Sequence, residues 1–421
     1  MEINHFISRH IGKKDGPNGK IGKNGNMIAI ISVSVSIAVI ITAVAVAGGF
    51  RQEIRRKASG YSGDITISSP GTDITNYEYS VRPLSYLHRI DSLPEVSEIY
   101  PVYYRQGILK GSGEVEGALF KGKSADDNGF FGENLCEGRL PDFMRRKDGD
   151  SESAASGEIM ISQRMAAAMN YKAGSRVIAY FIGDDIKVRS FKVAGVYDAQ
   201  LGESDKYLVI ADPRIIRGIN GWRNGECSGY EVLLKRFNDK NLDRAYSDIG
   251  NIIEDAMLDY DSSVVPVTVK QRYFALFDWL HLLDINVLII LILMIAVSGF
   301  NLISGILIIL FEHIPFIGAL KAMGMKNSNI SGVFIYKAAS IVLKGIIAGD
   351  LAAMAFCFSE YFFRFVKLNP ANYFVKYVPV DISLSAVLLI DAAAFLLIMV
   401  SLLVPFRFIS KVSPARALTV K

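Results

Sequence analysis

Four long apolar runs constrain the fold of this chain more than any other feature of its sequence. They cover residues 27–50, 285–311, 330–358 and 382–406. A helix rises about 1.5 Å per residue, so each run is long enough to cross a hydrocarbon core of roughly 30 Å. The sequence therefore predicts an α-helical integral membrane protein with four transmembrane helices.

The charges at both ends of the chain predict how these helices are oriented. Residues 1–26 form a basic arm, and residues 407–421 form a basic tail that contains no acid. Because segments rich in Lys and Arg remain in the cytoplasm, both termini are predicted to be cytoplasmic. The first run could alternatively belong to a cleaved signal peptide, whose apolar core spans about 7–15 residues. Residues 27–50 exceed that length, so we expect an uncleaved anchor.

Residues 51–281 contain no run of membrane length and predict a large extracytoplasmic α+β domain between the first and second helices. Alternating or β-rich segments predict strands at Asp64–Ser68, Val102–Leu109, Val115–Phe120, Glu158–Ser162, Arg176–Ile182, Ile186–Tyr197, Tyr207–Ala211 and Tyr230–Lys235. Helices are predicted at Pro83–Ser92, Gln163–Asn170, from Asp212-Pro213 onward, and at Asn238–Tyr260. Residues 359–381 are predicted to form a second, shorter extracytoplasmic loop.

A polar break at residues 312–329 separates the second and third apolar runs and is predicted to be a cytoplasmic coupling segment. Pro315 suits the first position of a short helix that starts at Phe316, because its missing N–H is not needed there. Phe316, Leu320 and Met323 then share one face, with Ile317 beside them. Gly324 suits a left-handed C-terminal cap. A helix this short is not stable by itself, so we expect it to pack against a partner.

Composition narrows the class of protein further. The apolar content of 51% and the mean hydropathy of +0.28 fit a soluble domain fused to membrane helices. A net charge of +4 is too small to indicate a nucleic-acid partner. The three cysteines lack CxxC spacing, so no zinc or redox site is expected. A disulfide between Cys136 and Cys227 and two free thiols both remain open.

One motif points toward nucleotide binding but lacks the context that the motif requires. Residues 117–124 match the phosphate-loop pattern GxxxxGK[ST]. In a phosphate loop the pattern leads into a helix, whereas residues 125–129 here favour a break. We therefore interpret the segment as a strand that ends in a basic turn. No catalytic constellation, metal set or cofactor site is predicted in the chain, and Asp278, His281 and Asp284 are interpreted as interfacial residues.

Polar side chains inside the apolar runs are candidates for functional or structural roles. These intramembrane residues are Asn301, Lys344, Asp350 and Asp391. Lys344 and Asp391 lie at comparable predicted depths, so we expect them to form an ion pair, with a proton or ion pathway as the alternative. Asn301 is expected to hydrogen-bond to a neighbouring helix.

Several segments in this topology resemble a known permease family. They are Gly49–Ile54 after the first run, Ile317–Gly324, which is similar to an IGxLKALG segment, Val378–Val380 before the last run, and Pro414–Leu418, which is similar to a PAxAL signature. Together they resemble the ABC-transporter permeases of the lipoprotein-releasing type. The macrolide-exporter and FtsX-like cell-division permeases are relatives of that type.

This resemblance implies mechanotransmission. A separate cytoplasmic ABC ATPase, which binds ATP and Mg²⁺, would drive the extracytoplasmic domain. A second permease subunit would complete a homodimer or heterodimer that extracts lipoproteins from the outer leaflet of the inner membrane. Efflux of amphiphiles and regulation of cell-wall hydrolases are the alternative functions. A periplasmic lipoprotein carrier is a further candidate partner, although the predicted turn at Tyr180–Ile186 looks too tight to recruit one directly.

The resemblance also implies two sets of site residues. The ATPase-coupling set is Glu312, Phe316, Ile317, Gly318, Leu320, Lys321, Met323 and Gly324. The set for an acyl-chain cavity between the first and second helices is Val46, Phe50, Leu276 and Leu280.

Overall fold

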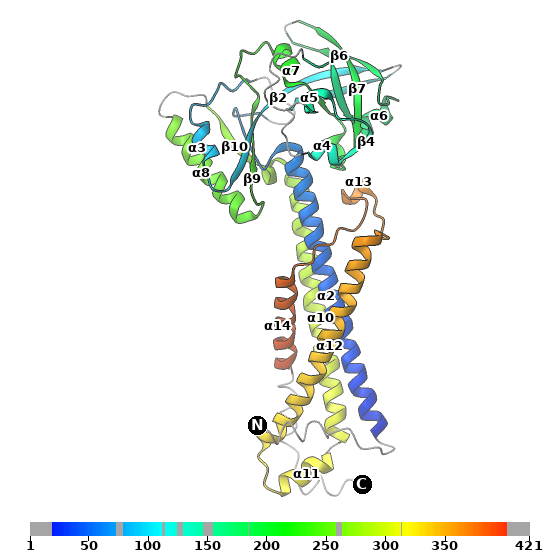
Figure 1. Ribbon diagram of the computed structural model, residues 1–421. Coiled ribbons are helices and arrows are strands. Elements are labelled where there is room, and N and C mark those ends of the chain that lie inside the picture. The colour runs from blue at the N-terminus through cyan, green and yellow to red at the C-terminus, as the bar shows by residue number, and fades with distance from the viewer. Residues whose placement is uncertain are drawn as a thin grey trace. The chain divides into compact units, whose positions relative to one another are not determined.

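The chain divides into two compact units, which we describe separately. The computed structural model describes residues 19–72, 79–111, 114–123, 129–145, 155–183, 185–257, 263–312 and 314–401. The helical unit comprises Met1–Gln52, Trp279–Lys367 and Tyr377–Lys421, and the α/β unit comprises Glu53–Asp278 and Leu368–Lys376 (Figure 1). Most of the predicted basic arm, the predicted tail, the PAxAL-like segment and His313 lie outside the described residues.

Four long helices contain the apolar runs. They are α2 (Gly19–Ser62), α10 (Phe274–Glu312), α12 (Asn327–Phe363) and α14 (Leu384–Ser401), and each is long and apolar enough to cross a membrane. The short helix α11 (Ile314–Ala322) lies between α10 and α12. The predicted runs are thus helical where they are described, except that α14 begins at Leu384, two residues after the predicted start at Ile382. The helices α2 and α10 continue well beyond the apolar residues into polar sequence.

Glycines allow α12 to approach α2 closely within the helical unit. A Cβ atom on Gly345 would lie 2.6 Å from Val33 Cβ, and one on Gly349 would lie 2.7 Å from the Ser34 carbonyl oxygen. Aliphatic side chains of α2, α10, α12 and α14 fill the space around this contact, including Ile37. Gly345 and Gly349 are four residues apart and therefore lie on one face, as in the GxxxG pattern of packed membrane helices.

Among the described residues, the α/β unit has ten strands in two lobes that share β2. Its strands are β1 (Ile65–Ser68), β2 (Val96–Lys110), β3 (Val115–Gly122), β4 (Leu135–Gly138), β5 (Glu158–Ser162), β6 (Arg176–Phe181), β7 (Lys187–Tyr197), β8 (Leu208–Ala211), β9 (Gly229–Leu234) and β10 (Val265–Thr268). Its helices are α3 (Leu87–Asp91), α4 (Phe130–Glu133), α5 (Asp142–Arg145), α6 (Gln163–Ala168), η1 (Gly202–Asp205), α7 (Pro213–Asn220), α8 (Asp239–Met257), α9 (Val269–Arg272) and α13 (Pro370–Tyr373).

The first lobe is a sheet with the strand order β10-β1-β9-β2, and all of these pairs are antiparallel. The apolar stripe of α8, including Leu242 and Ile249, packs with residues of β1 and β9 in one core. This helix is the one that the sequence pattern predicted at Asn238–Tyr260. Thr268 and Gln271 form a capping box at the start of α9, just before the chain enters α10.

The second lobe is a closed ring of strands. The strands β2, β3, β8, β5 and β7 pair in that order, and β6 pairs with both β7 and β2 and so completes the ring. Phe120, Phe181 and Phe191 stack inside it, with ring centroids 4.8 to 6.4 Å apart. Closure leaves the ring with few unpaired strand edges.

The predicted strands are all present. β5 spans Glu158–Ser162, as predicted. β2 begins six residues before the predicted start, and β4 and β10 were not predicted. Asp212 caps α7 by accepting a hydrogen bond from the Arg214 N–H, with Pro213 at the first position, as the sequence indicated. Cys136, Cys227 and Cys357 are free thiols, so the structure contains no Cys136–Cys227 disulfide.

Candidate functional sites

The short helix α11 ends as the sequence predicted. Gly324 has φ +86°. The Gly324 N–H donates to the Lys321 carbonyl oxygen at 3.0 Å, and the Met325 N–H donates to the Leu320 carbonyl oxygen at 3.0 Å. These bonds satisfy carbonyl groups at the end of the helix and turn the chain toward α12. At its other end α11 starts at Ile314, two residues before the predicted start, so Pro315 lies in its first turn.

The side chains of α11 and of the turn that follows it divide between the bundle and the surface. Ile317 is fully buried in the core of the helical unit, Gly318 is buried, and Leu320 packs partly against the same core. Met323 is 74% exposed. The predicted apolar face therefore has Leu320 turned toward the bundle and Met323 turned toward solvent. The side chains of Glu312 and Phe316 lie outside the described part of the structure.

A cavity opens in the helical unit between α2, α10 and the start of α14. Its volume is about 390 Å³, and most of its lining is aliphatic, including Ile41, Val44, Leu291 and Val387. Arg51, Asp284 and Asp381 also line it, and Arg51 forms an ion pair with Asp284. The cavity combines an apolar wall with a few charged groups, which is the make-up of a binding site for an amphiphile.

Gly49 of α2 lets the chain that enters α14 pass close to this helix. A Cβ atom on Gly49 would lie 2.4 Å from the Pro379 carbonyl carbon, so only glycine permits the segment before α14 to cross α2 here. The Asp381 N–H then donates to the Ala45 carbonyl oxygen at 3.0 Å. This crossing places the Asp381 side chain at the cavity.

The predicted acyl-chain residues do not line this cavity. Its lining includes neighbours of Val46 and Phe50 on α2 but neither of these residues, and it does not include Leu276 or Leu280. Phe50 instead packs edge-on against the Trp279 ring, with centroids 5.9 Å apart. The acyl-chain role of these four residues stays a prediction.

The intramembrane polar residues pair differently from the prediction in one case. The Asn301 side-chain amide donates to Ser32 Oγ at 2.6 Å, which confirms an interhelical bond between α10 and α2. The Asp391 side chain lies beside that of Asp350 rather than that of Lys344, so the predicted Lys344–Asp391 pair is wrong. Six residues of helix turn Lys344 about 120° away from Asp350, and Lys344 is exposed.

The two lysines of the phosphate-loop pattern bind the end of α2. Lys121 Nζ donates to the Tyr61 carbonyl oxygen at 2.6 Å, and Lys123 Nζ donates to the Gly60 carbonyl oxygen at 3.2 Å. Both side chains are buried. Cations beside the last carbonyl groups of a helix stabilise its negative end. The pattern is therefore part of strand β3 and caps the helix that leaves the helical unit.

The carboxylate of Glu231 balances these two buried lysines. Glu231 Oε1 lies 2.6 Å from Lys121 Nζ and also accepts from the Tyr104 hydroxyl group at 3.1 Å. Burial by itself would raise the pKa of Glu231, but Lys121 and Lys123 bring that pKa below its usual value. Burial lowers the pKa of Lys121, and the charge of Glu231 opposes this shift. The cluster is an ion pair that depends on both partners.

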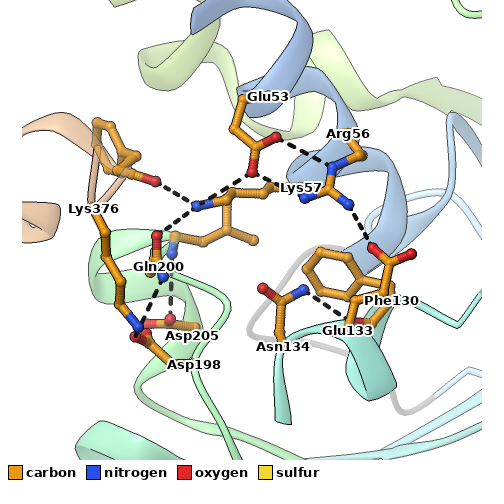
Figure 2. A network of polar contacts seen from close by, with 12 residues as sticks. Glu53, Arg56, Lys57, Phe130, Glu133, Asn134, Asp198, Gln200, Asp205 and Lys376 are labelled. Atoms are coloured by element: carbon orange, nitrogen blue, oxygen red, sulfur yellow. Dashed lines mark hydrogen bonds and ion pairs between the residues drawn. The ribbon is translucent and has the colours of Figure 1, made fainter. Parts of the chain in front are cut away.

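A third buried lysine, Lys57, holds part of the connection between α12 and α14 in the α/β unit. Figure 2 shows Lys57 Nζ between the Gln200 side chain and the backbone of the 368–376 segment. It donates to Gln200 Oε1 at 2.8 Å and to the Phe374 carbonyl oxygen at 2.7 Å. Lys376 of that segment forms an ion pair with Asp198 at 3.0 Å.

Sequence reasoning missed the glycine contact and this lysine for different reasons. The Gly345-x-x-x-Gly349 spacing is visible in the sequence and could have predicted the close approach of a partner helix. Lys57 offers no such pattern, because its partners lie 143 and 317 residues away along the chain.

Two domain families match the chain in succession. The family described as "MacB-like periplasmic core domain" matches residues 27–237, and the family described as "FtsX-like permease C-terminal" matches residues 288–414. Among solved structures, the periplasmic region of MacB from Actinobacillus actinomycetemcomitans has 15% identity and a TM-score of 0.34, and the match covers 52% of this chain and 95% of that one.

Curated relatives match nearly the whole chain. The "Lipoprotein-releasing system transmembrane protein LolC" of Neisseria meningitidis is 23% identical over 416 residues, and that of Buchnera aphidicola is 20% identical over 399 residues. In both cases the match covers 93% of this chain and 93% of the relative. With its four apolar helices, the chain is an inner-membrane protein with a periplasmic domain. It belongs to the MacB/FtsX-like superfamily of ABC-transporter permeases and, within that superfamily, to the LolC type.

Proposed function

We propose that this permease couples ATP hydrolysis by a separate cytoplasmic ABC ATPase to movement of its periplasmic domain. We further propose that its cargo is a lipoprotein, which it extracts from the outer leaflet of the inner membrane together with a second permease subunit. In the proposed topology both termini and α11 are cytoplasmic. The chain itself binds no nucleotide in this scheme, because Lys121 and Lys123 cap α2.

The cavity in the helical unit is the observation that carries the lipoprotein assignment. Along α2 its lining extends from Ile41 to Arg51, which corresponds to about 15 Å of helix. The charged group Arg51 lies where the apolar run of α2 gives way to the periplasmic domain sequence. An acyl chain would fill the aliphatic part, while its polar head would remain near Arg51 and Asp284 at the outer-leaflet surface. ATP-driven extraction requires that such a chain be held there.

Filling this cavity tests the proposal in cells. In a strain depleted of the native permease, a Leu291→Trp variant should leave lipoproteins in the inner membrane, because the indole occupies space that the acyl chain needs. Leu293→Trp is the matched control, since Leu293 is on the same helix, is 56% exposed and does not line the cavity. The measurement is the distribution of labelled lipoproteins between separated inner and outer membranes.

The outcomes separate the candidate functions. We expect depletion and Leu291→Trp to retain lipoproteins in the inner membrane, while Leu293→Trp restores their normal distribution. If lipoproteins reach the outer membrane during full depletion, lipoprotein release is the wrong function, and efflux or regulation of cell-wall hydrolases replaces it. If only Leu291→Trp is without effect, the cavity is not the acyl-chain site.

A further inference from the structure

The connection between α12 and α14 is part of the α/β unit, although it joins two helices of the helical unit. Residues Leu368–Lys376 belong to the α/β unit, whereas Lys367 and Tyr377 on either side of them belong to the helical unit. We call residues 368–376 the strap. Within the strap, Asn369 caps α13 by accepting from the Ala371 N–H at 3.0 Å, and Val375 is buried.

One buried ammonium group holds the strap. Lys57 is 2% exposed, and its Nζ donates to the Phe374 carbonyl oxygen and to Gln200 Oε1 (Figure 2). Glu53 Oε1 is 3.9 Å away. Burial lowers the pKa of Lys57 to about 8, while the charges of Glu53 and Asp198 oppose this shift, so the group is mostly protonated at pH 7. A protonated lysine needs acceptors here, and the strap supplies one of them.

The two residues that accept hydrogen bonds from Lys57 both have an unfavourable backbone conformation. Gln200 has φ +57° and Phe374 has φ +60°, a region that residues other than glycine seldom adopt. Next to them, a Cβ atom on Gly202 would lie 3.0 Å from the Phe374 ring. Such strain persists only where the surroundings fix it, and it gathers at sites where position matters. The contact is therefore built with a specific geometry.

We propose that Lys57 is a positioning residue whose hydrogen bonds fix the strap to the periplasmic domain, a contact that we call the pin. Through the pin, movement of α12 and α14 would reach this domain together with movement of α2. Lys57 lies on α2 itself, so a single side chain joins the extension of the first membrane helix to the connection between the third and fourth. This inference rests on the proposed function, because it assumes that helix movement drives the periplasmic domain. The Lys376–Asp198 ion pair is a second, more exposed fastening of the same strap.

Hydrogen exchange on the intact, detergent-solubilised complex tests the pin without any transport assay. Lys57→Met removes the donor and keeps most of the aliphatic side chain. Amides of residues 368–376 should then exchange about tenfold faster or more, since a hydrogen bond from a charged donor is lost. Arg56→Met is the matched control. It removes a charge from the same helical turn, and Arg56 pairs with Glu53 and Glu133 rather than with the strap.

A second variant keeps the test valid if Lys57→Met does not fold. Lys376→Met leaves Lys57 in place and breaks only the exposed fastening, so it should raise exchange of the same amides by a smaller factor. If exchange in the strap is unchanged in Lys57→Met, or rises equally in Arg56→Met, the proposed pin is wrong.

Coupling is tested by restoring the strap through another bond. In purified complexes, Lys57→Met should keep ATP hydrolysis but release less lipoprotein per ATP. Joining Asp198→Cys to Lys376→Cys with a short bifunctional thiol reagent, in a Cys136→Ser background, should restore release. If exchange rises but release does not fall, the strap is pinned yet carries no movement. If the wild-type complex releases no lipoprotein, the proposed function is wrong. Hydrogen exchange of residues 368–376 then still tests whether Lys57 fixes the strap.

Discussion

At the scale of single residues, Glu231 determines whether the end of α2 is stably joined to the sheet. The Glu231 carboxylate forms an ion pair with Lys121, and the Lys121 side chain is fully buried. Lys123 lies in the same cluster. Leaving one member of a buried ion pair without its partner costs about 3–5 kcal/mol. An exposed ion pair contributes only about 0–1 kcal/mol.

We therefore predict that Glu231→Leu lowers the free energy of unfolding of the protein by about 3–5 kcal/mol at pH 7. Glu133→Leu is the control, because Glu133 forms an exposed pair with Arg56, and its effect should stay below about 1 kcal/mol. Denaturant titration followed by tryptophan fluorescence measures both values. Equal effects of the two substitutions would show that the buried cluster contributes no more to the free energy of unfolding than an exposed ion pair does.

The same carboxylate predicts a dependence on acid. The folded state lowers the pKa of Glu231 from its usual 4.5, so the contribution of this group is complete above pH 4.5 and is lost as the pH falls through the lower folded value. The difference in unfolding free energy between the wild type and Glu231→Leu should thus shrink below pH 4.5. A constant difference down to pH 3 would contradict this assignment.

At the scale of elements, the contact between α2 and α12 depends on glycine. We predict that Gly345→Ala destabilises the helical unit by about 1–3 kcal/mol, because the new methyl group would meet Val33 at 2.6 Å. Gly299→Ala is the control, since its nearest neighbour within α14 is 3.4 Å away. Thermal unfolding in detergent compares them. An unchanged midpoint for Gly345→Ala would mean that the two helices are free to separate.

Element by element, the sequence predicted what local pattern determines and missed what distant contacts determine. Apolar length predicted the four helices, and alternation predicted strands such as β5 and β7. Capping residues predicted the start of α7 at Asp212 and the end of α11 at Gly324. These features depend on residues within one or two turns of each other.

The failures share the opposite property. The Lys344–Asp391 pair was predicted from depth alone, whereas the rotation of α12 decides which residue faces Asp391. The strand β10 contains Pro266, which argues against a strand in the sequence pattern, and it forms by pairing with β1. The positions of Lys57 and Glu231 depend on tertiary contacts across more than 100 residues. Sequence patterns within one segment do not contain that information.

At the scale of the whole molecule, the proposal requires that α11 receive movement from outside the chain. Ile317 anchors α11 in the core of the helical unit, and Met323 is exposed in the turn that follows α11. A partner ATPase that binds Met323 would therefore move α11, which is already packed against α10 and α12 in their shared core. Met323→Asp should leave the fold unchanged and abolish this binding, because a charge replaces the exposed apolar contact.

Release of lipoprotein from proteoliposomes that contain this permease, its partner subunit and the ATPase tests the account most directly. The account predicts that a labelled lipoprotein leaves the membrane only when ATP is hydrolysed. It also predicts that Met323→Asp reduces this release at least tenfold while the variant permease remains inserted. Release that is independent of ATP, or no release by an assembled complex that hydrolyses ATP, would contradict it.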